Sequence, residues 1–224
     1  MQDLWDRIDA ALTEQVARHN ADIDEDDREE LSLDRLKGAT PAQLDALATL
    51  IGYPLPEDFR ESFLIRDGFR YRIAPYGAAL SDSQFLLNLE GITREVKFWG
   101  EFLREDPDHA AGARPDCRPA GPVAPIMWSR GWLPFVGEGS GNHLCLDLDP
   151  PAGGTAGQVF DFGHEEGPTR VFFPSFRAYM ERFALDLKSG ALRFDIEANH
   201  GEYTAEVAEY RGQNPGKFDP NGGA

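Results

Sequence analysis

Six acidic and imidazole side chains in the second half of the chain are of the types that bind metal ions. They are Glu138, His143, Asp147, Asp149, Asp161 and His164. Carboxylate and imidazole groups brought together from neighbouring strands would suit a divalent cation used in phosphoester hydrolysis. Their spacing matches no metal-binding motif, since H-E-x-x-H, paired C-x-x-C and calcium-loop patterns are all missing from the sequence. The sequence therefore favours no metal site, although a metal-dependent hydrolase using Asp147, Asp149 and Asp161 stays open as an alternative.

A simpler structural role fits the first two aspartates. They would form the polar face and the end of a strand, with an aspartate accepting hydrogen bonds from backbone donors of the Pro-Pro-Ala-Gly-Gly turn that follows.

A glycine-rich stretch at residues 137–141 has the composition of a phosphate-binding loop but not its sequence. It lacks the Lys-Ser/Thr pair and the following helix, so we expect a tight turn between two strands. Ser140 is not in a G-x-S-x-G elbow and is not expected to be a nucleophile. Cys117 and Cys145 lie in different contexts and are expected to be free thiols. The sequence thus predicts no catalytic residue, no cofactor and no enzymatic activity.

A series of predicted strands would position these side chains. Alternating residues predict strands at 132–136, 143–149, 158–162 and 169–173, joined by short turns into an antiparallel meander. In the second strand the leucines share one face, so Asp147 and Asp149 are expected on the opposite, exposed face.

Helices are expected on both sides of this meander in the sequence. Helical spacing of apolar residues predicts them over the first twenty residues, from Pro41 to Gly52, from Pro56 to Asp67, over 91–103, and from Pro174 to Gly190. Residues 69–73 alternate like a half-buried strand. The predicted fold class is α+β: an antiparallel sheet packed with N-terminal helices and a closing C-terminal helix.

Three regions follow from these elements. We expect an acidic helical N-terminal extension at 1–39, a core domain at 40–187 with a Pro/Gly-rich insertion at 106–125, and a C-terminal extension at 188–224. Residues 22–34, here called the acidic block, carry eight acids and one arginine. Such a block is often no more than a solvated connector.

Charge and hydropathy exclude several classes of function. The chain has 39 acidic and 22 basic residues and a formal net charge of −17, so direct binding of nucleic acid is not expected. No stretch approaches the roughly 18 uncharged residues that a membrane span needs, and the N-terminus has no leader pattern. The sequence therefore predicts a cytoplasmic protein.

Four segments, in this order and spacing, resemble the SMI1/KNR4 family, also called the SUKH superfamily. They are residues 55–59 leading to Asp67-Gly68, residues 132–135, residues 141–150 with 157–159, and residues 174–176 with the helix after them. The resemblance covers about 40–187 and implies an α+β domain with an antiparallel sheet. It brings no catalytic residues with it.

The resemblance also implies a protein-binding function. Bacterial members are chiefly associated with immunity against toxins, many of them nucleases, and fungal members with cell-wall synthesis and signalling. The charge favours the first role, since an acidic surface can occupy the basic cleft of a nuclease. We therefore expect a bacterial immunity protein that neutralises a basic toxin, with a cell-wall regulator or scaffold as the alternative. The expected contacts are Asp24, Glu25, Asp26, Asp27, Asp147 and Asp149. The sequence leaves the oligomeric state open.

Overall fold

The computed structural model describes residues 1–28, 37–69, 71–73, 84–114, 117, 120–197 and 199–203. Within these residues, seven α- and 3-10-helical segments precede the four long strands of the sheet, and one further helix follows them. The helical elements are α1 Gln2–His19, η1 Asn20–Asp22, η2 Glu25–Asp27, α2 Pro41–Ile51, α3 Glu57–Ile65, α4 Leu89–Glu105, α5 Pro107–Ala110 and α6 Phe176–Ser189. The strands are β1 Phe85–Leu86, β2 Trp132–Gly137, β3 His143–Asp147, β4 Gln158–Gly163, β5 Gly167–Phe173, β6 Leu192–Asp195 and β7 His200–Tyr203.

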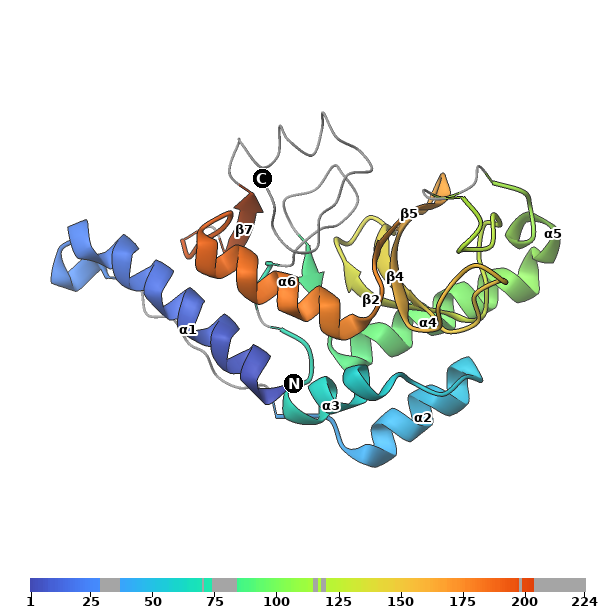
Figure 1. Cartoon of the computed structure of the whole chain (residues 1–224), viewed down its shortest axis with the longest axis horizontal. Helices are drawn as coiled ribbons and strands as arrows, with labels where there is room; N and C mark the ends of the chain where they lie inside the picture. Colours follow the sequence, from blue (N-terminus) through green and yellow to red (C-terminus); the bar gives the residue numbers. More distant parts are fainter. Residues whose placement is uncertain are drawn as a thin grey trace.

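The strands β1 to β5 form one antiparallel sheet in the order of the chain. This confirms the predicted meander and the α+β class, and β6 and β7 form a separate hairpin beyond α6. In Figure 1, α1 and α6 lie beside each other at the left, and the sheet lies to the right with α4 and α5.

The structure confirms the predicted start and end of α2. The Thr40 side chain accepts a hydrogen bond from the Gln43 N–H, and the Gln43 side chain in return accepts from the Thr40 N–H, so α2 begins with a capping box. Gly52 ends α2 with a φ of +84°, a left-handed conformation that glycine adopts without steric cost.

The prediction of a strand at residues 69–73 was wrong. The described residues there, 69 and 71–73, do not form one. The Phe69 N–H donates to the Leu86 carbonyl, whereas the Arg72 carbonyl accepts from the Gly201 N–H of β7. The two ends of this short segment therefore pair with two different sheets, so the segment does not continue as a strand of either one.

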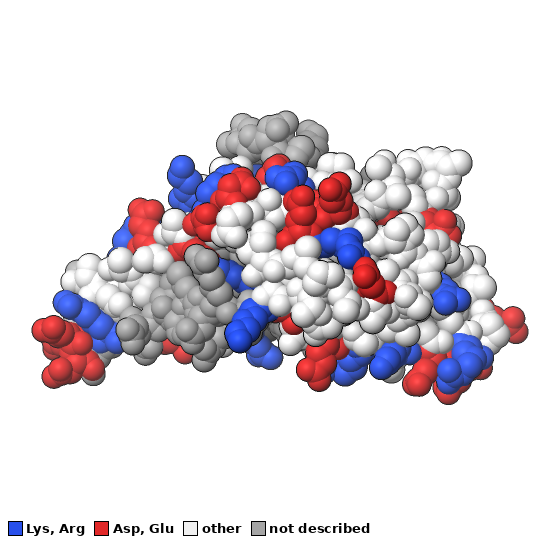
Figure 2. Space-filling model, turned by 90° about the horizontal axis from the view of Figure 1, so that it is seen from below, with Lys and Arg blue, Asp and Glu red and all other residues white. Residues whose placement is uncertain are grey.

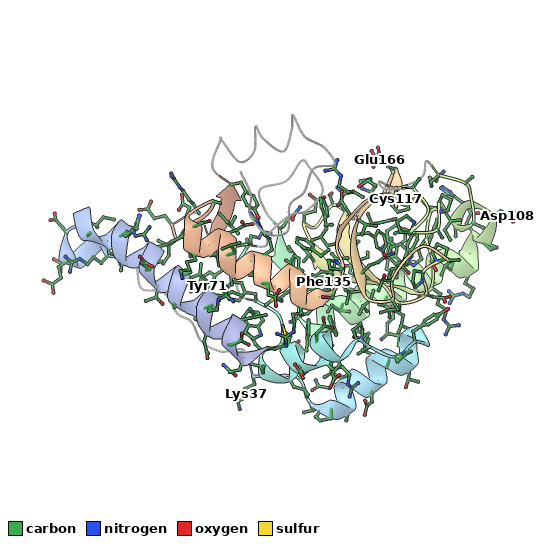
Figure 3. The ribbon with its side chains drawn as sticks, in the orientation of Figure 1. Lys37, Tyr71, Asp108, Cys117, Phe135 and Glu166 are labelled. Carbon is green, nitrogen blue, oxygen red and sulfur yellow. The ribbon has the colours of Figure 1, made fainter. Side chains whose placement is uncertain are left out.

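A large core fills one face of the sheet and receives the N-terminal helix. Phe135 of β2 lies beside α6, with its ring centroid 5.4 Å from that of Phe176 and 5.1 Å from that of Tyr179 (Figure 3). Leu4 and Trp5 of α1 are almost completely buried in the same core. The N-terminal helix thus packs against this chain, a point that the sequence left open.

A second core covers the opposite face of the sheet. The Trp99 ring on α4 stacks on Trp128 at 4.4 Å between centroids, and Phe162 of β4 meets both rings edge-on. The predicted insertion at 106–125 supplies further buried side chains, among them Val123 and Cys117. Figure 3 shows Cys117 well apart from Phe135, which belongs to the first core. The sheet is therefore covered on both faces.

Candidate partner-binding surfaces

Asp147 was expected on an exposed strand face, and the structure shows that this expectation was wrong. Its side chain is completely buried, because the second core covers that face of β3. Asp147 Oδ1 accepts from the Asp149 N–H at 3.3 Å, and Oδ2 accepts from Gln158 Nε2 at 3.3 Å. Burial raises the pKa of Asp147 to about 6. The carboxylate thus accepts a backbone hydrogen bond at the following turn, as its simpler structural role predicts.

Asp149 lies just beyond β3 and is exposed. Its Oδ2 accepts a 2.8 Å hydrogen bond from the Tyr53 hydroxyl, which ties the connection between α2 and α3 to the end of β3. That hydrogen bond raises the pKa of Tyr53 above its ordinary value. Of the two strand aspartates, only Asp149 is placed at the surface.

The six metal-type side chains do not converge. The register of β3 and β4 pairs Asp147 with Gln158 and Leu144 with Asp161, so Asp147 and Asp161 point to opposite faces of the sheet. In the part of the chain that the structure describes, no group of three or more His, Cys, Asp or Glu side chains is placed to hold a metal ion.

Asp161 is a buried carboxylate with an incomplete set of partners. Its Oδ2 accepts from the Thr169 hydroxyl at 2.8 Å, and its Oδ1 has no hydrogen-bond partner among the described residues. Burial raises the pKa of Asp161 to about 6, with Glu138 and Glu166 adding to the rise and Thr169 opposing it. Ionisation of this buried carboxyl lowers the free energy of unfolding, so the contribution of Asp161 to stability should depend on pH.

His143 and His164 have separate, local partners. The buried His143 ring lies 3.5 Å from the Glu95 carboxylate of α4, and this contact lowers the pKa of Glu95. His164, at the tip of the β4–β5 hairpin, interacts with the Asn142 side chain through Nδ1 at 2.9 Å. The Ser140 hydroxyl donates to Glu138. Each of these contacts stabilises a strand end or a hairpin tip.

The described acids of the acidic block lie at one end of the molecule. Asp24, Glu25 and Asp26 follow α1 and are exposed, and the side chain of Asp27 lies outside the described residues. Figure 2 shows acidic side chains gathered at the end where α1 terminates, and acidic and basic side chains interspersed over the rest of that face. This end of the molecule is a candidate contact surface for a basic protein.

The structure also contains a groove that the sequence did not reveal. It lies between α2 and α4, which are neighbours at the lower right of Figure 1, and has a volume of about 440 Å³. Its lining comes from segments far apart in the chain and consists of Leu50, Ile51, Val96, Lys97, Gly100, Glu101, Leu103, Arg104, Trp128, Arg130 and Trp132. Val96 and Leu103, which belong to the helix predicted over 91–103, are only half-buried.

Comparison with known proteins is consistent with this architecture. The family model described as "SMI1 / KNR4 family (SUKH-1)" matches residues 38–182. The chain belongs to this family. None of the helices in the described part of the chain combines the length and apolar character that a membrane span requires.

Several named relatives of this SMI1/KNR4 family chain are fungal. It is 29% identical over 210 residues to the "Cell wall biosynthesis/cell cycle regulator smi1" of Schizosaccharomyces pombe, covering 89% of this chain and 41% of the relative. It is 26% identical over 193 residues to the "Glucan synthesis regulatory protein" of Neurospora crassa, covering 73% and 36%. The chain therefore spans less than half the length of these relatives. A bacterial origin and an immunity role remain predictions.

Proposed function

We propose that the chain is a non-enzymatic, protein-binding regulatory domain that acts in cell-wall synthesis or assembly. The observation that carries this proposal is the match over 89% of the chain to a protein named as a cell-wall biosynthesis regulator. A relative named as a glucan synthesis regulatory protein supports the same assignment. Cell-wall regulation therefore takes precedence over the toxin neutralisation expected from the sequence.

The placement of the ionisable side chains supports a binding role. Asp147 and His143 are engaged in internal contacts that fix the ends of strands. Asp24, Glu25 and Asp26 are instead exposed at the end of α1, where long-range attraction to a basic surface would speed association.

Neutralisation of a basic toxin is the second candidate function. The observation that favours it is the net charge of −17 together with the exposed acids Asp24, Glu25 and Asp26. Such a surface would exclude nucleic acid from a basic nuclease cleft by occupying it. The two functions share a binding mode and differ in the partner.

Affinity capture tests both functions in one experiment. The tagged full chain is used as bait in lysate of the organism that encodes it, at low and at high salt, and retained proteins are identified by mass spectrometry. The control bait is the acidic-block variant, defined as Asp24→Asn, Glu25→Gln and Asp26→Asn. Specific recovery of wall-synthesis or signalling proteins supports the proposal. A basic toxin-like protein that is lost at high salt and from the variant supports the second function, and no specific protein in either arm contradicts both.

A further inference from the structure

The groove between α2 and α4 differs in charge from the rest of the molecule. Its lining includes the cations Lys97, Arg104 and Arg130 and a single acid, Glu101. The whole chain, by contrast, has 39 acidic and 22 basic residues. The groove is therefore a local cationic site on a strongly acidic protein.

The cations are held at the groove without being neutralised internally. The Arg130 Nε donates to the Ile51 carbonyl at 3.2 Å, which fixes the guanidinium at the end of α2. Among the described residues, neither Lys97 nor Arg130 forms an ion pair within 4.0 Å. In the described part of the chain, the ion pair of Arg104 is with its neighbour Glu105, at 3.7 Å and at the exposed surface, where such a pair contributes little. All three positive charges remain available to an anionic ligand.

The floor of the groove is apolar. The buried residues Trp128 and Trp132 line one side, and Leu50 with Val96 provides aliphatic surface from the two helices. A volume of about 440 Å³ falls within the range of ligand sites, roughly 300 to 1,000 Å³. An apolar floor with a cationic rim suits a ligand that has an apolar side chain flanked by negative charges.

Gly100 gives a second, independent indication that a ligand backbone approaches the groove closely. It lies in the middle of α4, where glycine costs ~1 kcal/mol relative to alanine. A Cβ added at Gly100 would meet no atom of the described residues within 4 Å, so none of them requires glycine there. Among the reasons for such a glycine, close approach of another backbone is the one consistent with its position in the groove lining.

We propose that the α2–α4 groove binds an acidic peptide segment of a partner protein, with one aliphatic or aromatic side chain seated beside Gly100. The proposal rests on the protein-binding function above and adds the chemistry of the ligand. A long polyanion such as nucleic acid fits less well, because only three cations face it and the surrounding chain is acidic. A second copy of this chain is a further alternative that the experiment distinguishes.

The test begins by selecting peptides from a random dodecapeptide library displayed on phage, using the immobilised full chain as target. Enriched peptides are synthesised with a fluorescent label, and their dissociation constants are measured by fluorescence polarisation. We expect them to carry net negative charge and at least one large apolar residue. Enrichment of basic or uncharged peptides, or of none, overturns the proposal.

Gly100 offers a way to block the groove. Gly100→Trp places an indole in open space, where it should leave the helix folded and weaken binding at least about tenfold, equivalent to ~1.4 kcal/mol. Gly100→Ala is the matched control that fills almost none of the groove. Phe98→Ser alters an exposed side chain of the same helix outside the lining and should leave affinity unchanged. Circular dichroism checks that all three variants are folded.

Charge reversal provides a second test that does not depend on filling the groove. Lys97→Glu combined with Arg104→Glu should weaken the selected peptides at least about tenfold and reduce the salt dependence of binding. The control reverses two exposed cations elsewhere, Arg18→Glu with Arg193→Glu, and matches the change in net charge. Equal loss in both double variants would show a general field effect and overturn the groove assignment.

The two proposals fail in different ways. If a captured partner that also binds the acidic-block variant binds Gly100→Trp as well as the wild type, protein binding stands and the groove is not the site. If the wild-type chain captures no specific protein, the proposed function itself fails. Sedimentation of the unliganded chain separates the remaining alternative, because a dimer that Gly100→Trp dissociates would assign the groove to a second copy and overturn the peptide proposal.

Discussion

Replacing Asp161 by asparagine should stabilise the protein at neutral pH and have a smaller effect in acid. The carboxyl is buried, only one of its oxygens accepts a hydrogen bond from a described residue, and its pKa rises from 3.8 to about 6 on folding. Because the folded state holds the proton more tightly, the wild type gains stability as the pH falls through 6 toward 4. Asparagine keeps an acceptor for the Thr169 hydroxyl and carries no charge.

The size of the effect follows from the two pKa values. A difference of about two pH units corresponds to ~3 kcal/mol at pH 7.5, where the wild-type carboxylate is ionised in both states. At pH 5.0 the folded wild type is mostly protonated at Asp161, and the advantage of Asp161→Asn falls to ~1.5 kcal/mol. Measurements should stay above the sequence isoelectric point of about 4.6, where low net charge favours aggregation.

Urea unfolding followed by tryptophan fluorescence measures this difference at both pH values. Asp147→Asn is the matched control, since its pKa also rises to about 6 but both of its oxygens accept from N–H donors. Asparagine would turn an amide group toward one of those donors and lose a hydrogen bond, so we expect a gain smaller by ~1 kcal/mol. An advantage of Asp161→Asn that is equal at pH 5.0 and 7.5, or a loss of stability at pH 7.5, would refute the reasoning.

Four further predictions concern other parts of the molecule. Arg66→Ala should lower the free energy of unfolding by ~3 to 5 kcal/mol in urea titrations, because it strands Asp9, which Arg66 contacts through two hydrogen bonds of 2.8 and 2.7 Å in a largely buried pair. Arg18→Ala should cost less than ~1 kcal/mol in the same assay, since its pair is exposed. Gly52→Ala should lower the free energy of unfolding by ~1 kcal/mol, because residue 52 has a left-handed φ that alanine adopts only with strain. An unchanged melting temperature would contradict that conformation. The acidic-block variant should bind a basic partner with a slower association rate and a flatter salt dependence, measured by stopped flow, and unchanged kinetics would remove these acids from the interface.

The sequence predicted helix ends and strands well where they depend on interactions between residues close together in the chain. The cap at Thr40 and the stop at Gly52 depend on backbone groups within a few residues, and both are present. The meander was predictable for the same reason, since each strand alternates and each turn contains glycine or proline. The segment at 69–73 failed because its alternation says nothing about which strands its backbone groups meet.

The placement of Asp147 failed for a longer-range reason. Alternation correctly separates its face of β3 from the leucine face, but it does not show whether that face meets water or a second layer. The covering layer comes from α4 and from the proline-rich insertion, whose buried Val123 and Cys117 lie among prolines and have no period to reveal them. The groove between α2 and α4 was equally hidden, since its lining joins three segments, 50–51, 96–104 and 128–132, that are separate in the sequence.

The acidic end of α1 and the cationic groove place opposite charges at separate positions on one molecule. Mobile ions screen charges beyond roughly 8 Å at physiological ionic strength, so each site acts on a ligand mainly through its own side chains. At longer range, and above all in low salt, the net charge of −17 attracts basic proteins and repels acidic ones. A basic partner would therefore be steered to the end of α1, whereas an acidic peptide would reach the groove against the overall field and be retained there by short-range contacts with Arg130, Lys97 and the tryptophan wall. The two surfaces consequently favour a regulator that joins two different partners, or one partner that carries a basic domain and a separate acidic segment.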